Sequence, residues 1–189
     1  MEGLILANLG LLMHLMNDQR EAAHYCTEAL EVSLEIGERD TEAYARTCLA
    51  HAYLELGQIP DALTNYELAV SMRRAAGQET QMLEPLAGLA RTYLRLQEPK
   101  HALQYVEEIL SHLDIHTYAG IVELVRIYLT CYRVLYLLQD PRAEELLRMG
   151  HTTLQERAAR IVDRGLRRRY LEHVIAHREL LTEYEIHQQ

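Results

Sequence analysis

Apolar residues recur along the chain with helical spacing, in short amphipathic segments that come in pairs. Between residues 43 and 55 (AYARTCLAHAYLE) they fall on one stripe of 3.6-residue period. Gly57-Gln-Ile-Pro60 then ends this helix and begins the next, because proline is tolerated in the first helical turn. Residues 61–76 again carry an apolar face, on Ala62, Leu63, Tyr66, Ala69 and Val70. The pattern predicts an antiparallel helical hairpin.

This hairpin recurs at a constant step along the chain. Leu9-Gly10, Leu49-Ala50 and Leu89-Ala90 hold the same place in the first helices. The second helices repeat in the same register at Ala22, Ala62 and Ala102, at Cys26, Tyr66 and Val106, and at Ala29, Ala69 and Ile109. Self-similarity with a period of ~40 residues is typical of solenoids. We therefore predict an all-α fold, a right-handed superhelical solenoid of about four hairpins with C-terminal capping helices.

The predicted organisation follows from this register. Residues 1–139 form the hairpins, with units near 4–36, 41–76, 79–113 and 117–162, the last one degenerate. In that unit we expect an apolar helix over 118–138, an N-cap at Asp140 before Pro141, and a long second helix over 142–162. Residues 140–189 thus hold this second helix and, after Gly165, two short capping helices.

These positions resemble the tetratricopeptide repeat, whose pattern combines a Leu-Gly/Ala pair and Tyr with Ala, an aromatic residue and Ala in the second helix. Residues 4–113 carry the resemblance, although the period is 40 rather than 34 and Met13 and Cys26 replace aromatic residues. The resemblance implies a non-catalytic scaffold that binds proteins or peptides. Residues 132–180 resemble the end of the repeat arrays in large bacterial multidomain signalling ATPases and transcriptional regulators, which implies a segment of a larger regulatory protein. No GxxxxGK[ST] motif accompanies that resemblance.

Composition narrows the class of protein further. The 189 residues include 28 acidic and 19 basic side chains, a formal net charge of −9, which weighs against a nucleic-acid partner. Nine glycines and four prolines are too few for a β-sandwich. The apolar stretch 3–16 is too short for a membrane span. Cys26, Cys48 and Cys131 are widely spaced, so we expect reduced thiols and a cytoplasmic location.

The concave face of the array is the main candidate binding site. In such arrays the first helix of each hairpin lines this face, and the register selects Tyr44, Thr47, His51, Glu84, Arg91, Arg95, Arg126 and Arg133. Four arginines on two adjacent helices of an acidic chain could hold a carboxylate or an acidic peptide, since guanidinium groups bind carboxylates bidentately. The alternative is that these arginines pair with Glu84, Glu123 or other acids nearby.

The remaining chemistry favours structural roles. We expect the pair His173 and His177 to be solvated, because a metal site needs further ligands. The arginines between Arg157 and Arg169 give an alternative function, a nucleic-acid-associated regulator, although Glu156, Asp163 and Glu172 interleave with them. Cys131 lies in an apolar helix and is predicted to be inert. No catalytic, cofactor-binding or metal-ligating residues are predicted, and the chain is not expected to be an enzyme.

The N-terminal helix departs from the pattern of a terminal repeat. Residues 4–16 are apolar almost all round, whereas the end of a solenoid should carry a polar outer face. This helix is therefore expected to have a neighbour on both sides. We predict either missing upstream repeats or a homodimer, with self-association through Leu4, Ile5, Leu11 and Leu15.

Overall fold

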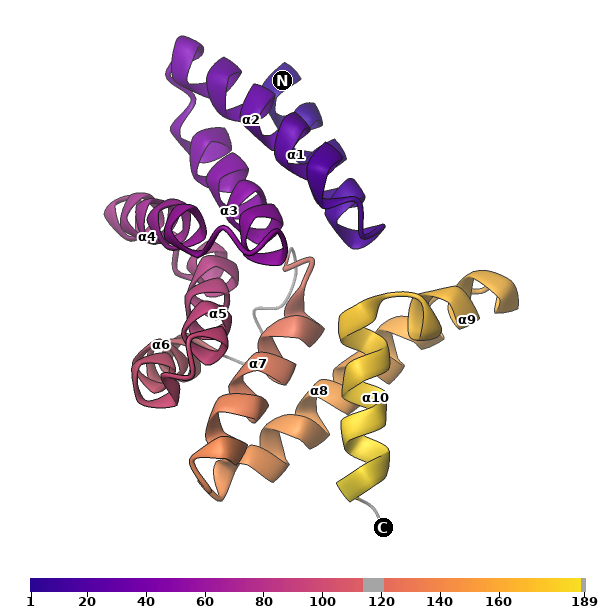
Figure 1. Cartoon of the computed structure of the whole chain (residues 1–189). Coiled ribbons are helices and arrows are strands. Elements are labelled where there is room, and N and C mark those ends of the chain that lie inside the picture. The colour runs from indigo at the N-terminus through magenta and orange to yellow at the C-terminus, as the bar shows by residue number, and fades with distance from the viewer. Residues whose placement is uncertain (114–120, 188–189) are drawn as a thin grey trace.

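The computed structural model describes residues 1–113 and 121–187, which form ten helices and no strands (Figure 1). The first eight helices make four antiparallel hairpins, as the repeat predicts. The helices are α1 (Glu2–Leu15), α2 (Gln19–Ile36), α3 (Arg39–Glu55), α4 (Ile59–Ala75), α5 (Glu79–Arg95), α6 (Pro99–His112), α7 (Leu124–Leu137), α8 (Arg142–Ala159), α9 (Arg164–Glu172) and α10 (Ile175–His187).

Helix ends recur at even spacing and share one geometry. Asn17, Gly37, Gly57, Gly77 and Gln97 all have positive φ, and Gln139 closes the fourth hairpin in the same way. After each of them, the next backbone N–H donates to the carbonyl five residues back, as Glu38 does to Ser33 at 2.9 Å. This is the Schellman ending, in which a left-handed residue satisfies the last helical carbonyls. From position 17 to position 97 this ending recurs at a step of 20 residues, half of the repeat period.

The repeated positions of the second helices form the core of the stack. Small residues in this register let neighbouring helices approach closely, while the larger ones fill the space between hairpins. All nine have no exposed surface: Ala22, Ala62, Ala102, Cys26, Tyr66, Val106, Ala29, Ala69 and Ile109. The period of the sequence is therefore the period of the hydrophobic core.

The hairpins follow one another along a curve (Figure 1). Each first helix packs on both helices of the hairpin before it, as α3 does on α1 and α2. Helix α10 packs in the same manner on α7 and α8, so it takes the place of a fifth first helix, whereas α9 links α8 to α10. The C-terminal helices thereby cap the end of the array.

The degenerate fourth unit differs from its predicted boundaries. The helix expected over 118–138 begins at Leu124, after a turn at 122–123, and residues 118–120 lie outside the described part. The second helix ends at Ala159 rather than at 162. Pro141 holds the N-cap position instead of Asp140, although the Asp140 carboxylate still accepts the Arg142 N–H at 2.9 Å.

Candidate functional site

A cavity of about 370 Å³ lies where the C-terminal ends of α1, α3 and α5 approach α7 and α10. Its volume is in the range of small-ligand and peptide pockets. We call it the central cavity, and its lining comprises His14, Leu15, Asn17, Gln19, Glu55, Arg91, Leu94, Arg95, Arg126, Leu129, Thr130, Arg133, Val174, Ile175, Ala176 and Glu179. All four arginines selected from the sequence thus converge on one cavity, although they come from two helices.

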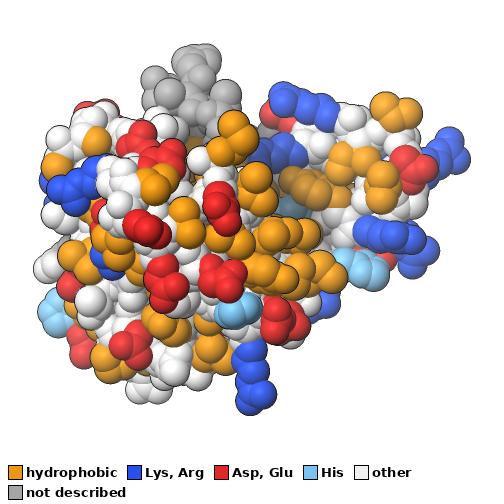
Figure 2. All heavy atoms as spheres, turned by 90° about the horizontal axis from the view of Figure 1, so that it is seen from above, with side chains coloured by type: hydrophobic (Ala, Val, Ile, Leu, Met, Phe, Trp, Pro, Cys, Tyr) orange, Lys and Arg blue, Asp and Glu red, His pale blue; other side chains and the backbone are white. Residues whose placement is uncertain are grey.

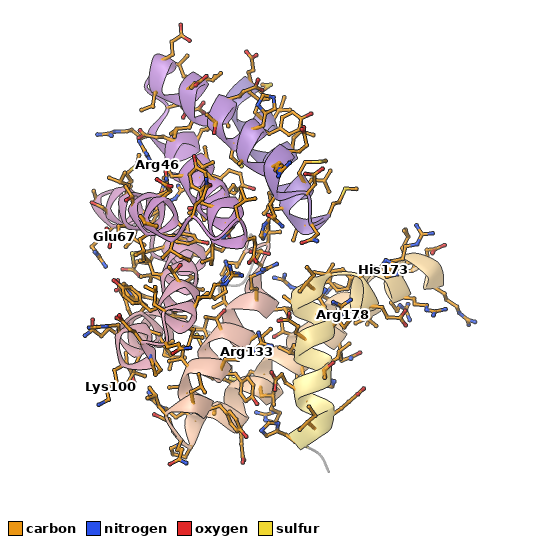
Figure 3. All side chains as sticks on the ribbon, viewed as in Figure 1. Arg46, Glu67, Lys100, Arg133, His173 and Arg178 are labelled. Atoms are coloured by element: carbon orange, nitrogen blue, oxygen red, sulfur yellow. The ribbon has the colours of Figure 1, made fainter. Side chains whose placement is uncertain are left out.

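Three of these arginines have acidic partners. Arg95 donates to the Glu55 carboxylate and to the Leu54 carbonyl. Arg133, which lies between α7 and α10 in Figure 3, donates to Glu179 at 2.9 Å and to Glu183 at 3.2 Å. These contacts hold the guanidinium groups in fixed positions around the cavity.

The third partner is Glu123, which lies directly before α7. Its Oε1 is 2.8 Å from Nε of Arg126, close enough for an ion pair although the angles do not make a hydrogen bond. Burial alone would raise the pKa of Glu123, but Arg126 and other nearby positive charges outweigh it and lower the pKa to about 2. Glu123 is only 7% exposed, and because its pKa is lowered it is ionised inside the protein.

Arg91 differs from the other three arginines. Its Nη2 lies 3.0 Å from Nδ1 of His51 and donates to the Tyr66 hydroxyl at 3.3 Å, but its Nε and Nη1 are buried without a hydrogen-bond partner. An unsatisfied buried donor is costly, more so when it is charged. Arg91 is therefore the cavity arginine with two buried donors that lack a partner, whereas Arg126 has one, its Nε.

A layer of buried rings supports Arg91 from behind. His51 is 2% exposed, stacks on His14 with ring centroids 5.4 Å apart, and lies 2.6 Å from the Tyr66 hydroxyl through Nδ1. Since an arginine can only donate, Nδ1 of His51 must accept and its proton sits on Nε2. Burial lowers the pKa of His14, and lowers that of His51 well below its usual value. Both rings are neutral at pH 7.

The fold is expected to lose stability as the pH falls below about 6.5. The pKa of His14 and of His51 is lower in the folded state than in the unfolded chain, so the unfolded chain takes up protons first. The contribution of the two neutral rings to the free energy of unfolding is complete above that pH. Below it, this contribution declines by up to about 1.4 kcal/mol per pH unit for each ring. Urea unfolding at neutral and mildly acidic pH measures the free energy of unfolding that is lost on acidification. This loss should be smaller in His14→Gln than in wild type, and the exposed control His24→Gln should lose as much as wild type. An unchanged pH slope in His14→Gln would contradict this assignment.

The other predicted groove residues do not line the central cavity. Thr47 is 4% exposed and its hydroxyl donates to the Ala43 carbonyl, because α2 packs over this face of α3. Tyr44 is half-buried and donates to the Asn8 side chain at 3.0 Å. The Glu84 carboxylate accepts the N–H groups of Val122 and Glu123 and so holds the turn that precedes α7. His51 supports Arg91 without itself facing the cavity.

Sequence reasoning missed several lining residues, and the repeat register could have found some of them. Leu15, Glu55 and Arg95 hold equivalent places in successive hairpins and all line the cavity, so the register that selected Arg95 also marks the other two. Gln19 lies outside the first helices, and its side chain meets His14 at 2.8 Å. The residues of α10 could not be anticipated because the C-terminal segment does not follow the repeat.

The remaining candidate chemistry is dispersed. His173 and His177 do not share a helix, because α9 ends at Glu172 and α10 begins at Ile175 (Figure 3), and Nδ1 of His177 donates to the Tyr170 carbonyl at 2.7 Å. Over residues 1–113 and 121–187, no group of three or more His, Cys, Asp or Glu side chains could hold a metal ion. Cys131 is fully buried, and burial raises the pKa of its thiol to about 12.

The basic cluster of the C-terminal segment is partly engaged within the chain. Arg157 donates to the carbonyls of Ile121 and Val122, and Arg167 to that of Ile161. Arg168 pairs with Glu172 at 2.9 Å. Arg160, directly after α8, and Arg164 and Arg169, on α9, are exposed. Nothing in this arrangement favours nucleic acid as the ligand, and that alternative stays a prediction.

The self-association residues also separate into two groups. Leu4 and Ile5 are 45% and 55% exposed, as expected for a contact surface. Leu11 is only 7% exposed, because it packs on Cys26, Cys48 and Leu49 inside the array, so it is a core residue. Leu15 is half-buried against the same cluster and borders the central cavity.

Comparisons with known proteins agree with this architecture. The tetratricopeptide repeat family model matches residues 40–114. BtubC (BKLC) from P. vanneervenii has a similar structure, with a TM-score of 0.63 and 20% identity over 95% of this chain and 73% of that chain. A putative kinesin light chain from Podosopora anserina with nearly identical TPR-like repeats gives a TM-score of 0.57 and 14% identity, over 97% of this chain and 88% of that chain. No curated protein has a significantly similar sequence.

The family match falls on the repeats that the register identified from sequence, and the two structures show the same stacking of helical hairpins over nearly the whole chain. None of the described helices is both long and apolar enough to cross a membrane. Tetratricopeptide repeats generally mediate protein–protein interactions and are generally non-catalytic. Residues 40–114 of the chain match the tetratricopeptide repeat family, and the chain shares the fold of such repeat proteins over nearly its whole length.

Proposed function

We propose that the chain is a protein-interaction scaffold that binds an acidic peptide segment of its partner in the central cavity. The observation that carries the proposal is the convergence of Arg91, Arg95, Arg126 and Arg133, with Nε and Nη1 of Arg91 buried and unpartnered. A carboxylate oxygen placed there would accept a hydrogen bond from one of these nitrogens, since a guanidinium group only donates and a carboxylate only accepts. The cytoplasmic location and the signalling context implied by the C-terminal resemblance stay predictions.

The charge of the cavity supports an anionic ligand. Its lining holds four arginines against two glutamates, Glu55 and Glu179, while Glu123 and Glu183 pair with Arg126 and Arg133 from outside the lining. Among the described residues, Arg91 is the lining arginine without an ion-pair partner, so an anionic ligand would be favoured at this position. Apolar lining from Leu94, Leu129 and Val174 would contact the aliphatic parts of a peptide. Such a cavity selects acidic segments over basic ones.

Removal of Arg91 is expected to weaken acidic-peptide binding at least tenfold. A charge-assisted hydrogen bond is worth about 1.5–3 kcal/mol, which is about a tenfold or larger change in affinity. A peptide array with sequences of graded Asp and Glu content, followed by titration of the peptides retained, compares wild type with Arg91→Ala and Arg126→Ala. Wild type should retain acidic peptides, and their affinity should fall with added salt.

The matched control is Arg148→Ala. Arg148 is an exposed arginine on α8, it pairs with Glu145, and it does not line the cavity. Its variant should bind the same peptides as wild type. Circular dichroism establishes that each variant is folded, and the more exposed Arg95→Gln provides a second groove variant. Equal binding by wild type, Arg91→Ala and Arg126→Ala would remove the central cavity as the binding site.

A further inference from the structure

Helix α1 presents a stripe of large apolar side chains to solvent. Leu4, Ile5, Leu9, Leu12 and Met16 are 37–67% exposed. Figure 2, which looks onto this end of the molecule, shows hydrophobic side chains gathered on its surface. None of the five lines the central cavity, so this surface is separate from the proposed peptide site.

The repeat register shows what this stripe corresponds to in the other hairpins. One period further on, Ile5, Leu9 and Leu12 become Ala45, Leu49 and Ala52, which are 0–3% exposed under α2. In α5 the same places are Pro85, Leu89 and Thr92, which are also buried. The exposed face of α1 is therefore the face that seats another helix elsewhere in the array.

The exposed face of α1 nevertheless carries larger side chains than the corresponding buried face of α3. Ile5 and Leu12 stand where the inner hairpins have Ala45 and Ala52, and small residues at a helix contact permit the closest approach. Larger side chains on α1 hold a partner helix further away than α2 is from α3. This geometry fits pairing between two apolar, leucine-rich helices better than the addition of one more hairpin of the same kind.

We propose that the occupant is a second copy of this chain, whose α1 packs antiparallel on the first. The four residues Ile5, Leu9, Leu12 and Met16 are spaced by four, three and four, so the stripe reads the same in both directions. A two-fold axis between Gly10 and Leu11 places Ile5 against Met16 of the other copy and Leu9 against its Leu12. A self-complementary patch of this kind is what a two-fold dimer requires.

Area and charge are consistent with this pairing. The stripe presents roughly 500 Å² of apolar surface, large for a single patch on a monomer. Two copies bury about 1,000 Å², near the lower limit for a specific interface. Glu2 is the only Asp, Glu, Lys or Arg in α1, so dimerisation buries no charge in its centre. The antiparallel arrangement brings Glu2 close to the exposed Arg20 of the other copy, opposite in charge.

Sedimentation velocity from micromolar to near-millimolar concentration tests the proposal on the whole chain. Wild type should shift from monomer to dimer, and Leu12→Glu should weaken the dimer at least tenfold, because each copy would bury a carboxylate without a partner. Leu12 is 48% exposed, so this substitution leaves the monomer folded. The matched control is Val162→Glu at a 91% exposed position away from α1, which should dimerise as wild type does.

A charge exchange tests the antiparallel register. Glu2→Arg and Arg20→Glu should each weaken the dimer, and the double variant Glu2→Arg/Arg20→Glu should restore it. Wild type that stays monomeric throughout the concentration range overturns the proposal, and so does Leu12→Glu that dimerises as strongly as wild type. A double variant that remains as weak as the single ones overturns the antiparallel pairing.

Discussion

Glu123→Gln is expected to lower the free energy of unfolding by about 3–5 kcal/mol, which is the usual effect of removing one partner from a buried ion pair. Glu123 is 7% exposed and neutralises Arg126, at 2.8 Å, beside the buried guanidinium of Arg91. Glutamine would keep the shape of the side chain but leave two cations without a counter-charge. Urea unfolding followed by circular dichroism measures the change.

The pH dependence of this variant gives an independent check. The folded-state pKa of Glu123, about 2, is below its ordinary value of 4.5, so its stabilising effect is complete above the ordinary value and is lost as the pH falls toward 2. The difference in the free energy of unfolding between wild type and Glu123→Gln should therefore become smaller as the pH falls from 4.5 toward 2. The control is Glu145→Gln, whose solvent-exposed pair with Arg148 should leave the free energy of unfolding nearly unchanged. A loss equally small in Glu123→Gln would contradict the importance of the buried pair.

Gly88→Ala is expected to destabilise the fold by about 2 kcal/mol, as an overpacked core position does. An added Cβ would lie 2.2–2.7 Å from three ring atoms of Tyr66. That ring is fully buried and its hydroxyl contacts His51, so it has no free space in which to move. Overpacking of this kind costs about 1–3 kcal/mol, and the better helix propensity of alanine offsets about 1 kcal/mol at most. Thermal or urea unfolding detects the difference.

A double-mutant cycle separates this clash from a general effect on α5. Tyr66→Leu alone removes a buried ring, but it also makes room beside position 88. The stability lost in Gly88→Ala/Tyr66→Leu should therefore be smaller than the sum of the two single losses. Strict additivity would show that the two positions do not compete for the same space. In that case, close packing against Tyr66 would not be the reason for glycine at position 88.

The sequence alone determined the repeat and much of the core. Ala62, Tyr66 and Ala69 have counterparts in the neighbouring hairpins because each hairpin must bury the same face against the next, and burial confirms the pattern. The register also put Arg91, Arg95, Arg126 and Arg133 on first helices, and these four meet in one cavity. Local periodicity suffices for such features because it depends on residues a few positions apart.

The tertiary structure decided which side chains are engaged and which are available. Sequence could not show that Glu84 binds the turn before α7, that Arg133 pairs with α10, or that two nitrogens of Arg91 lack partners. Each of these contacts joins residues far apart in the sequence, through helices whose relative positions depend on packing along the whole array. The same holds for α1, where Leu11 enters the core while Leu12 faces solvent. A helix that is apolar all round is predicted to be buried, but its sequence does not indicate which side stays exposed. That depends on how the neighbouring helices are arranged.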